Sequence, residues 1–92
     1  MKKDARFYFA NLGADVSRCI TAAQENNEER YRDSLEMAHR TLEYLRNAGQ
    51  PEVYEEGLLL LRALEYARRD HTLPIFSKNL NALIEEYSPL VQ

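Results

Sequence analysis

The sequence predicts an all-α fold, an antiparallel up-down-up-down four-helix bundle formed as a single domain over residues 1–92. The chain is 45% hydrophobic and contains only three Gly and three Pro, a composition that favours helices over sheets. Apolar residues recur in alternating steps of four and three in four successive segments, which is typical of helices that cross at about 20°. The connections between these segments are short, so consecutive helices are expected to be neighbours.

The first helix is expected to run to about Gln24, with the carboxylate of Asp4 as its N-cap. Gly13 lies within this segment and leaves two alternatives open, one continuous helix or a helix divided into two pieces. The inward stripe of the helix consists of Ala5, Phe9, Leu12, Val16, Cys19 and Ala23.

The second helix is expected to begin near Asn26, which together with Glu29 has the spacing of a capping box. It is expected to end near Asn47, with Gly49 just beyond it to close the last turn. Its inward stripe consists of Tyr31, Leu35, Ala38, Leu42 and Leu45.

The third helix is expected to begin at Pro51, a residue suited to the first helical turn, and to end near Arg69. Gly57 lies in its inward stripe, where a missing side chain allows close helix approach or a mild bend. The other inward residues of this helix are Val53, Leu60, Leu64 and Ala67.

The fourth helix is expected to begin at about Pro74 and to end before Pro89. Leu73 precedes a proline and should be extended, so residues 70–73 are expected to form the preceding connection. The inward stripe consists of Phe76, Leu80, Leu83, Tyr87 and Leu90.

Four consecutive leucines at residues 58–61 cannot all face one core, because successive helical residues lie about 100° apart. Leu59 shares an outward stripe with Ala63 and Tyr66. Two interpretations stay open: neighbouring helices cover a broad apolar arc, or this stripe contacts another chain. We expect a protein–protein interaction or oligomerisation module, most simply a homodimer in which third helices pack together. The expected interface residues are Leu59, Ala63 and Tyr66, followed by Leu58 and Tyr44.

Composition also restricts the partners and the compartment. The net charge is −3 and no basic run is longer than two residues, so general nucleic-acid binding is not expected. No apolar run is long enough to span a membrane. The single cysteine, Cys19, lies on the inward stripe, where it serves as a small buried hydrophobe. A cytoplasmic protein without a cofactor is the expectation.

The segment RDSLEMAH, residues 32–39, resembles the signature of HEPN-type helical ribonucleases. In that family an Arg and a His are carried by a small helical bundle and meet across a dimer, so the resemblance implicates Arg32 and His39. The resemblance implies that the Arg holds a phosphate and the His moves a proton during RNA cleavage. The ordinary alternative is a solvated helix face with local i,i+4 pairs: Arg32 with Glu36, Glu36 with Arg40, and His39 with Glu43.

Glu36 and His39 also have the Glu-x-x-His spacing that places two metal ligands on one helix face. The pair occurs once, and carboxylate-bridged di-metal bundles need two such pairs and two further Glu. A symmetric dimer could supply the second pair. A metal site is therefore a weaker alternative to the interaction module.

Overall fold

Four helices make up the described part of the chain. The structure, a computed structural model, describes the backbone of residues 4–87 and the side chains of residues 4–83. Helix α1 spans Ala5–Gln24, α2 spans Glu28–Arg46, α3 spans Pro51–Arg69 and α4 spans Leu73–Tyr87. Within residues 4–87 there is no strand, and no helix is both long and apolar enough to cross a membrane. The predicted all-α class is confirmed, whereas the expected helix end before Pro89 and the inward positions of Tyr87 and Leu90 lie outside the described parts.

Capping side chains determine where α1 and α2 begin. Asp4 accepts a hydrogen bond from the Phe7 N–H at 3.0 Å, as predicted for the N-cap of α1. In α2 the N-cap is Asn27, whose side chain accepts a hydrogen bond from the Arg30 N–H at 3.0 Å. The predicted capping role of Asn26 is therefore wrong. Asn26 has a φ of 57° and closes the end of α1, because Asn adopts the left-handed conformation more readily than most residues.

A second left-handed residue closes α3. His71 has a φ of 60°, and the Thr72 N–H donates a hydrogen bond to the Ala67 carbonyl at 2.8 Å. This pattern satisfies a carbonyl that the helix end would otherwise leave unpaired. Helix α4 then begins at Leu73, one residue before the expected start at Pro74, so the expectation that Leu73 belongs to the connection is wrong. The side chain of Leu73 is buried in the core.

Both glycines that lie within helices are buried. Gly13 lies inside an unbroken α1, so the continuous helix is the alternative that the structure shows. At Gly57 a Cβ atom would lie 2.9 Å from Leu45 Cδ2 and 3.0 Å from both Leu12 Cδ2 and Leu42 Cδ1. Helices α1, α2 and α3 therefore meet at a point where α3 has no side chain.

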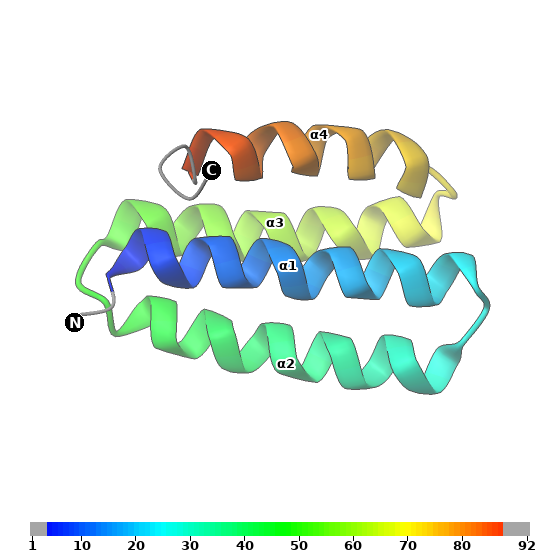
Figure 1. The fold of residues 1–92 in the computed structure, drawn as a ribbon, viewed down its shortest axis with the longest axis horizontal. Coiled ribbons are helices and arrows are strands. Elements are labelled where there is room, and N and C mark those ends of the chain that lie inside the picture. Colours follow the sequence, from blue (N-terminus) through cyan, green and yellow to red (C-terminus); the bar gives the residue numbers. More distant parts are fainter. Residues whose placement is uncertain (1–3, 88–92) are drawn as a thin grey trace.

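Helices α1 and α3 form the centre of the bundle. Each contacts the other three helices, whereas α2 and α4 do not contact each other within the described residues. Figure 1 shows the chain reversing direction at each connection, with α1 in front of α3 and with α2 and α4 on either side of this central pair. Consecutive helices are neighbours, as predicted.

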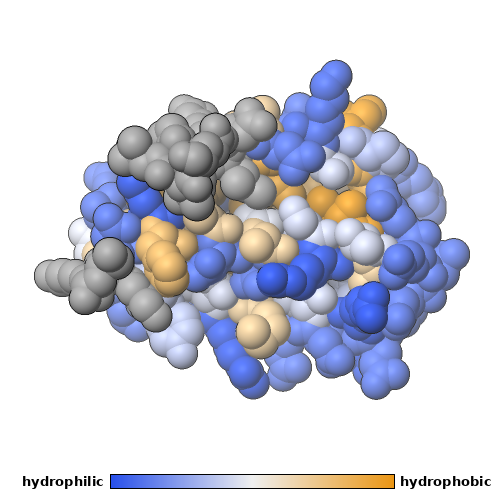
Figure 2. All heavy atoms as spheres, viewed as in Figure 1, coloured by the Kyte–Doolittle hydropathy of each residue, from blue (hydrophilic) through white to orange (hydrophobic). Residues whose placement is uncertain are grey.

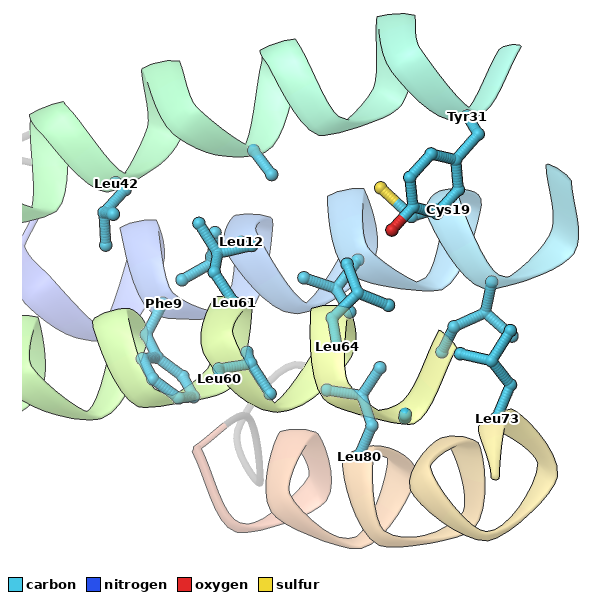
Figure 3. Packing of buried hydrophobic residues seen from close by; sticks show 14 of the residues in the cluster. Phe9, Leu12, Cys19, Tyr31, Leu42, Leu60, Leu61, Leu64, Leu73 and Leu80 are labelled. Carbon is cyan, nitrogen blue, oxygen red and sulfur yellow. The ribbon is translucent and has the colours of Figure 1, made fainter. Parts of the chain in front are cut away.

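The inward stripes form the hydrophobic core. Phe9 and Leu12 of α1, Leu64 of α3 and Leu80 of α4 are almost completely buried. Figure 3 shows Leu80 pointing towards Leu64, while Leu12 lies between α2 and α3. Burial of each such side chain contributes about 1.5–3 kcal/mol, so these contacts are the main source of stability. The predicted stripes are confirmed at these positions, whereas five other stripe residues are only partly buried: Ala23, Leu35, Val53, Phe76 and Leu83.

Candidate interaction surface

The outer side of α3 carries an apolar stripe that the bundle does not cover. Leu59, Ala63 and Tyr66 lie on successive turns of one side of the helix. Leu59 is 60% exposed and Tyr66 is 50% exposed, while Ala63 is half-buried. Neighbouring helices therefore do not cover Leu59. The interpretation of a broad apolar arc buried within the bundle does not hold for this residue.

Helix α4 extends this stripe into a groove. Ala63 and Tyr66 line one wall, and Ile75, Phe76 and Asn79 line the other. Ile75 is 65% exposed, more than any other large hydrophobic side chain that the structure describes. The groove has a volume of about 300 Å³, which is room for a few side chains of a partner. This volume is at the lower limit of ordinary small-molecule sites. Exposed apolar residues grouped around a groove are typical of protein–protein contacts.

The other two residues of the predicted interface lie apart from this groove. Leu58 is 41% exposed and points about 100° away from Leu59. Tyr44 of α2 stacks on Tyr8 of α1, with ring centroids 5.6 Å apart, and Phe7 packs edge-on against Tyr8 at 5.3 Å. Tyr44 thus belongs to an aromatic cluster between α1 and α2. Figure 2 views the bundle with α1 in front and shows a mainly hydrophilic face, on which apolar residues occur in separate spots and along the seam towards α4.

Exposed charged residues flank the apolar stripe of α3. Glu52, Glu55 and Glu56 are exposed in the N-terminal half of the helix, and its C-terminal half has both signs of charge, with Arg62, Glu65 and Arg69 exposed. The Nε of Arg69 donates a hydrogen bond to Asp70 at 3.3 Å, and both side chains are exposed.

A polar cluster on the opposite side of α3 fixes that helix to α2. The guanidinium of Arg68 lies 3.9 Å from the ring centroid of Tyr31 and donates a hydrogen bond to Glu28. A cation over an aromatic ring contributes about 0.5–1 kcal/mol at such partly exposed positions. Burial raises the pKa of Tyr31, although the charge of Arg68 opposes this effect. The hydrogen bond to Glu28 raises the pKa of Arg68. These shifts keep both groups in their usual protonation states at neutral pH.

Cys19 is fully buried beside this cluster and is not accessible as a nucleophile. Figure 3 shows its sulfur next to the ring of Tyr31. Burial raises the pKa of the Cys19 thiol from 9.0 to about 11, and the nearby charge of Asp15 adds to this effect. Because the thiolate is the reactive form, Cys19 is inert at neutral pH. Its predicted position in the core is confirmed.

Asp15 is a buried carboxylate that the sequence patterns do not single out. It is 5% exposed on α1, and its Oδ2 accepts a hydrogen bond from Thr41 Oγ1 of α2 at 2.6 Å. Its Oδ1 accepts a hydrogen bond from Arg18 Nη1 at 2.9 Å. Both carboxylate oxygens are paired, which offsets the cost of burying the charge. The contact between Asp15 and Thr41 therefore helps to set how α1 and α2 align.

The residues of the ribonuclease resemblance lie on the outer side of α2. Arg32, Glu36 and His39 are all exposed, and the spacing places Arg32 and His39 on one stripe, about 10.5 Å apart along the helix axis. Among the ion pairs of the described side chains, none joins Arg32 to Glu36, Glu36 to Arg40 or His39 to Glu43, so the predicted local pairing is not observed. Residues 4–83 also contain no group of three or more His, Cys, Asp or Glu arranged to hold a metal ion. A metal at Glu36 and His39 would need further ligands from outside the described side chains.

No protein-family model, no curated protein and no solved structure matches this chain. A fold as widespread as a four-helix bundle does not assign a function by itself. The function is therefore argued from the surface that the structure presents.

Proposed function

We propose that the protein acts through protein–protein contact, as an interaction or oligomerisation module, and that the surface formed by α3 and α4 makes the contact. The observation that supports this proposal most directly is the exposure of Leu59 and Tyr66 on α3 and of Ile75 on α4, with Tyr66 and Ile75 lining one groove. Each of these side chains leaves half or more of its surface in water, where further burial would be favourable by about 25 cal/mol per Å².

The chemistry of the surface supports contact with a protein. Tyr66 offers a large apolar ring and a hydroxyl group that can donate or accept a hydrogen bond, a combination enriched at protein interfaces. Leu59 and Ile75 supply apolar anchors on the two helices that border the groove. Arg62 and Glu55 are exposed beside the stripe and would form the polar rim.

The variant Leu59→Glu tests the proposal because it places a charge on the exposed apolar stripe of α3 without altering the core. We expect the wild-type protein to bind a protein, a second copy or another polypeptide, and we expect this variant to bind at least about 30-fold more weakly, as for an interface hot spot. Sedimentation equilibrium and binding to the immobilised protein measure the two cases.

Met37→Glu is the matched control, because Met37 is 50% exposed on α2 and lies outside the groove. This variant should bind like the wild type. Equal binding by Leu59→Glu and wild type, or a loss confined to Met37→Glu, would refute the proposed surface. Circular dichroism at 222 nm verifies that all three proteins are equally helical.

A further inference from the structure

We infer that a groove between α1 and α2 binds a phosphate dianion, either free or as the phosphomonoester group of a small molecule. This inference goes beyond the proposed function, because the groove lies on other helices than the α3–α4 surface. It is carried by the buried hydroxyl group of Ser34, which has no partner within the described part of the chain and lines a groove that also contains two arginines.

The groove lies near the turn that joins α1 to α2 (Figure 1). Its volume is about 400 Å³, within the range of sites for small molecules. The described residues that line it are Ser17, Arg18 and Thr21 of α1 and Arg30 and Ser34 of α2. All five side chains can donate hydrogen bonds and none of the five is acidic, which suits an anionic ligand that is rich in oxygen.

Ser34 is the residue that points to a ligand. It is only 8% exposed, yet its hydroxyl makes no hydrogen bond to any other described residue. No side-chain oxygen or nitrogen of the described residues is both sealed from solvent and unpaired, so the Ser34 oxygen keeps access to the groove that it lines. Since buried polar groups are normally paired, a bound acceptor would complete the hydrogen bonding of this hydroxyl.

The helical spacing brings the donors of the two helices together. Ser17 and Thr21 are four residues apart on α1 and lie on one stripe. Arg30 and Ser34 have the same spacing on α2. A phosphate held between the helices would accept hydrogen bonds from both stripes, and planar guanidinium groups bind phosphate oxygens two at a time.

Two carboxylates near the groove leave donors of both arginines available. Arg18 Nη1 donates a hydrogen bond to Asp15 Oδ1 at 2.9 Å, which uses one of the five N–H groups of the guanidinium. Arg30 Nη1 lies 3.5 Å from Glu25 Oε1, and both side chains are more than half exposed, so this ion pair contributes little. A phosphate dianion carries more charge than one carboxylate and can contact both arginines together.

Two further acids are neighbours in the sequence but do not line the groove. Glu29 precedes Arg30 and Asp33 precedes Ser34, and both acids are exposed. Successive residues lie about 100° apart around a helix, so neither carboxylate points the same way as the lining residue that follows it. Their negative charges still oppose an anion, so we expect a dissociation constant of about 1 mM rather than a micromolar one.

Titration of the whole chain with inorganic phosphate, followed by ¹H–¹⁵N NMR at constant ionic strength, tests the site. We expect saturable shifts of the amide signals of the lining residues, whereas chloride should shift none of them. Arg18→Gln, Arg30→Gln and Ser34→Ala should each weaken binding about three- to tenfold. Glu25→Gln removes the carboxylate that competes for Arg30 and should tighten binding about threefold.

Arg40→Gln is the matched control, because Arg40 is an exposed arginine of α2 outside the groove. It should bind phosphate like the wild type, and a loss as large as that of Arg30→Gln would show unspecific attraction and overturn the inference. The absence of saturable shifts up to about 50 mM phosphate would overturn it as well. Circular dichroism at 222 nm verifies that the variants are equally helical.

Ribose 5-phosphate and ribose identify the source of the phosphate. Tighter binding of ribose 5-phosphate than of inorganic phosphate would support a phosphorylated small molecule, and equal binding would support free phosphate. Ribose that shifts the same signals as ribose 5-phosphate would overturn the inference. Leu59→Glu should bind phosphate like the wild type, so a failure at this groove leaves the proposed contact through α3 and α4 intact.

Discussion

Replacing Gly57 with alanine is expected to destabilise the bundle although it improves helix propensity. The change should gain about 1 kcal/mol from propensity in a helix interior. The new Cβ would lie 2.9 Å from Leu45 Cδ2 and 3.0 Å from Leu12 Cδ2 and Leu42 Cδ1, whereas non-bonded carbon atoms pack at about 3.5–4.0 Å. Three leucines from two helices must therefore retreat together by about 0.5–1 Å. Leu12 and Leu45 are fully buried and cannot move towards solvent.

The magnitude follows from these opposing effects. Inserting a methyl group into a well-packed core costs about 1–3 kcal/mol, so the net loss in the free energy of unfolding should be about 1 kcal/mol after the gain in propensity. Urea unfolding followed at 222 nm should show a midpoint lower by about 0.5 M, with an unchanged slope. Thermal unfolding should shift downwards by about 4–8 °C in a domain of this size.

A second variant tests the cause. Adding Leu42→Val to Gly57→Ala shortens one of the leucines that the new methyl group meets, so the double variant should lose about 0.5–1 kcal/mol less than the sum of the two single changes. The reasoning is refuted if Gly57→Ala is more stable than the wild type by the full value of about 1 kcal/mol that propensity offers. That result would mean that the leucines move aside without cost.

Four further predictions follow from single residues. Thr41→Val should lower the free energy of unfolding by about 1–3 kcal/mol in urea titrations, because it leaves a buried oxygen of Asp15 without its donor. Since folding raises the pKa of Cys19 from 9.0 to about 11, stability should be full below pH 9 and fall as the pH rises through 11, and thermal melts of Cys19→Ala should lack this loss. His71→Gly should raise the melting temperature, with a gain of up to about 1 kcal/mol, because glycine adopts a φ of 60° without strain. His39→Ala should leave stability within about 0.5 kcal/mol and the cleavage of single-stranded RNA unchanged, whereas a loss of cleavage would support the ribonuclease alternative.

The helices could be predicted from the sequence because their signals are local. The Asp4 cap, Pro51 at the first turn and the inward stripes depend on residues within one or two turns, and the structure contains the cap, the proline and most residues of the stripes. The choice between Asn26 and Asn27 as the cap of α2 could not be made in the same way. Both are asparagines, and which one adopts the left-handed conformation depends on how α1 and α2 pack, a relation that no short segment specifies.

The groove and the buried carboxylate needed the tertiary structure for the same reason. The apolar period identifies the inward side of α3, but it does not say which helices cover the two shoulders, so Leu59 could be assigned to solvent only from the packing. The packing of α4 against α3 brings Ile75 to the groove. The sequence patterns do not specify this packing, so they do not identify Ile75 as a surface residue of the site. The partner of Asp15 is 26 residues away in the sequence, beyond the reach of any helical pattern.

The two central helices differ in how completely they are covered, and this difference bears on the proposed contact. Both contact the other three helices, yet nine residues are buried in α1 and only five in α3. The sequence of α3 nevertheless contains the four consecutive leucines, and Leu58 and Leu59 remain exposed while Leu60 and Leu61 are buried. Among the described residues, no helix buries Leu59, so this part of the outer side of α3 stays exposed. A partner that docks on this side, as proposed, would bury Leu59, and the variant Leu59→Glu would then weaken its binding.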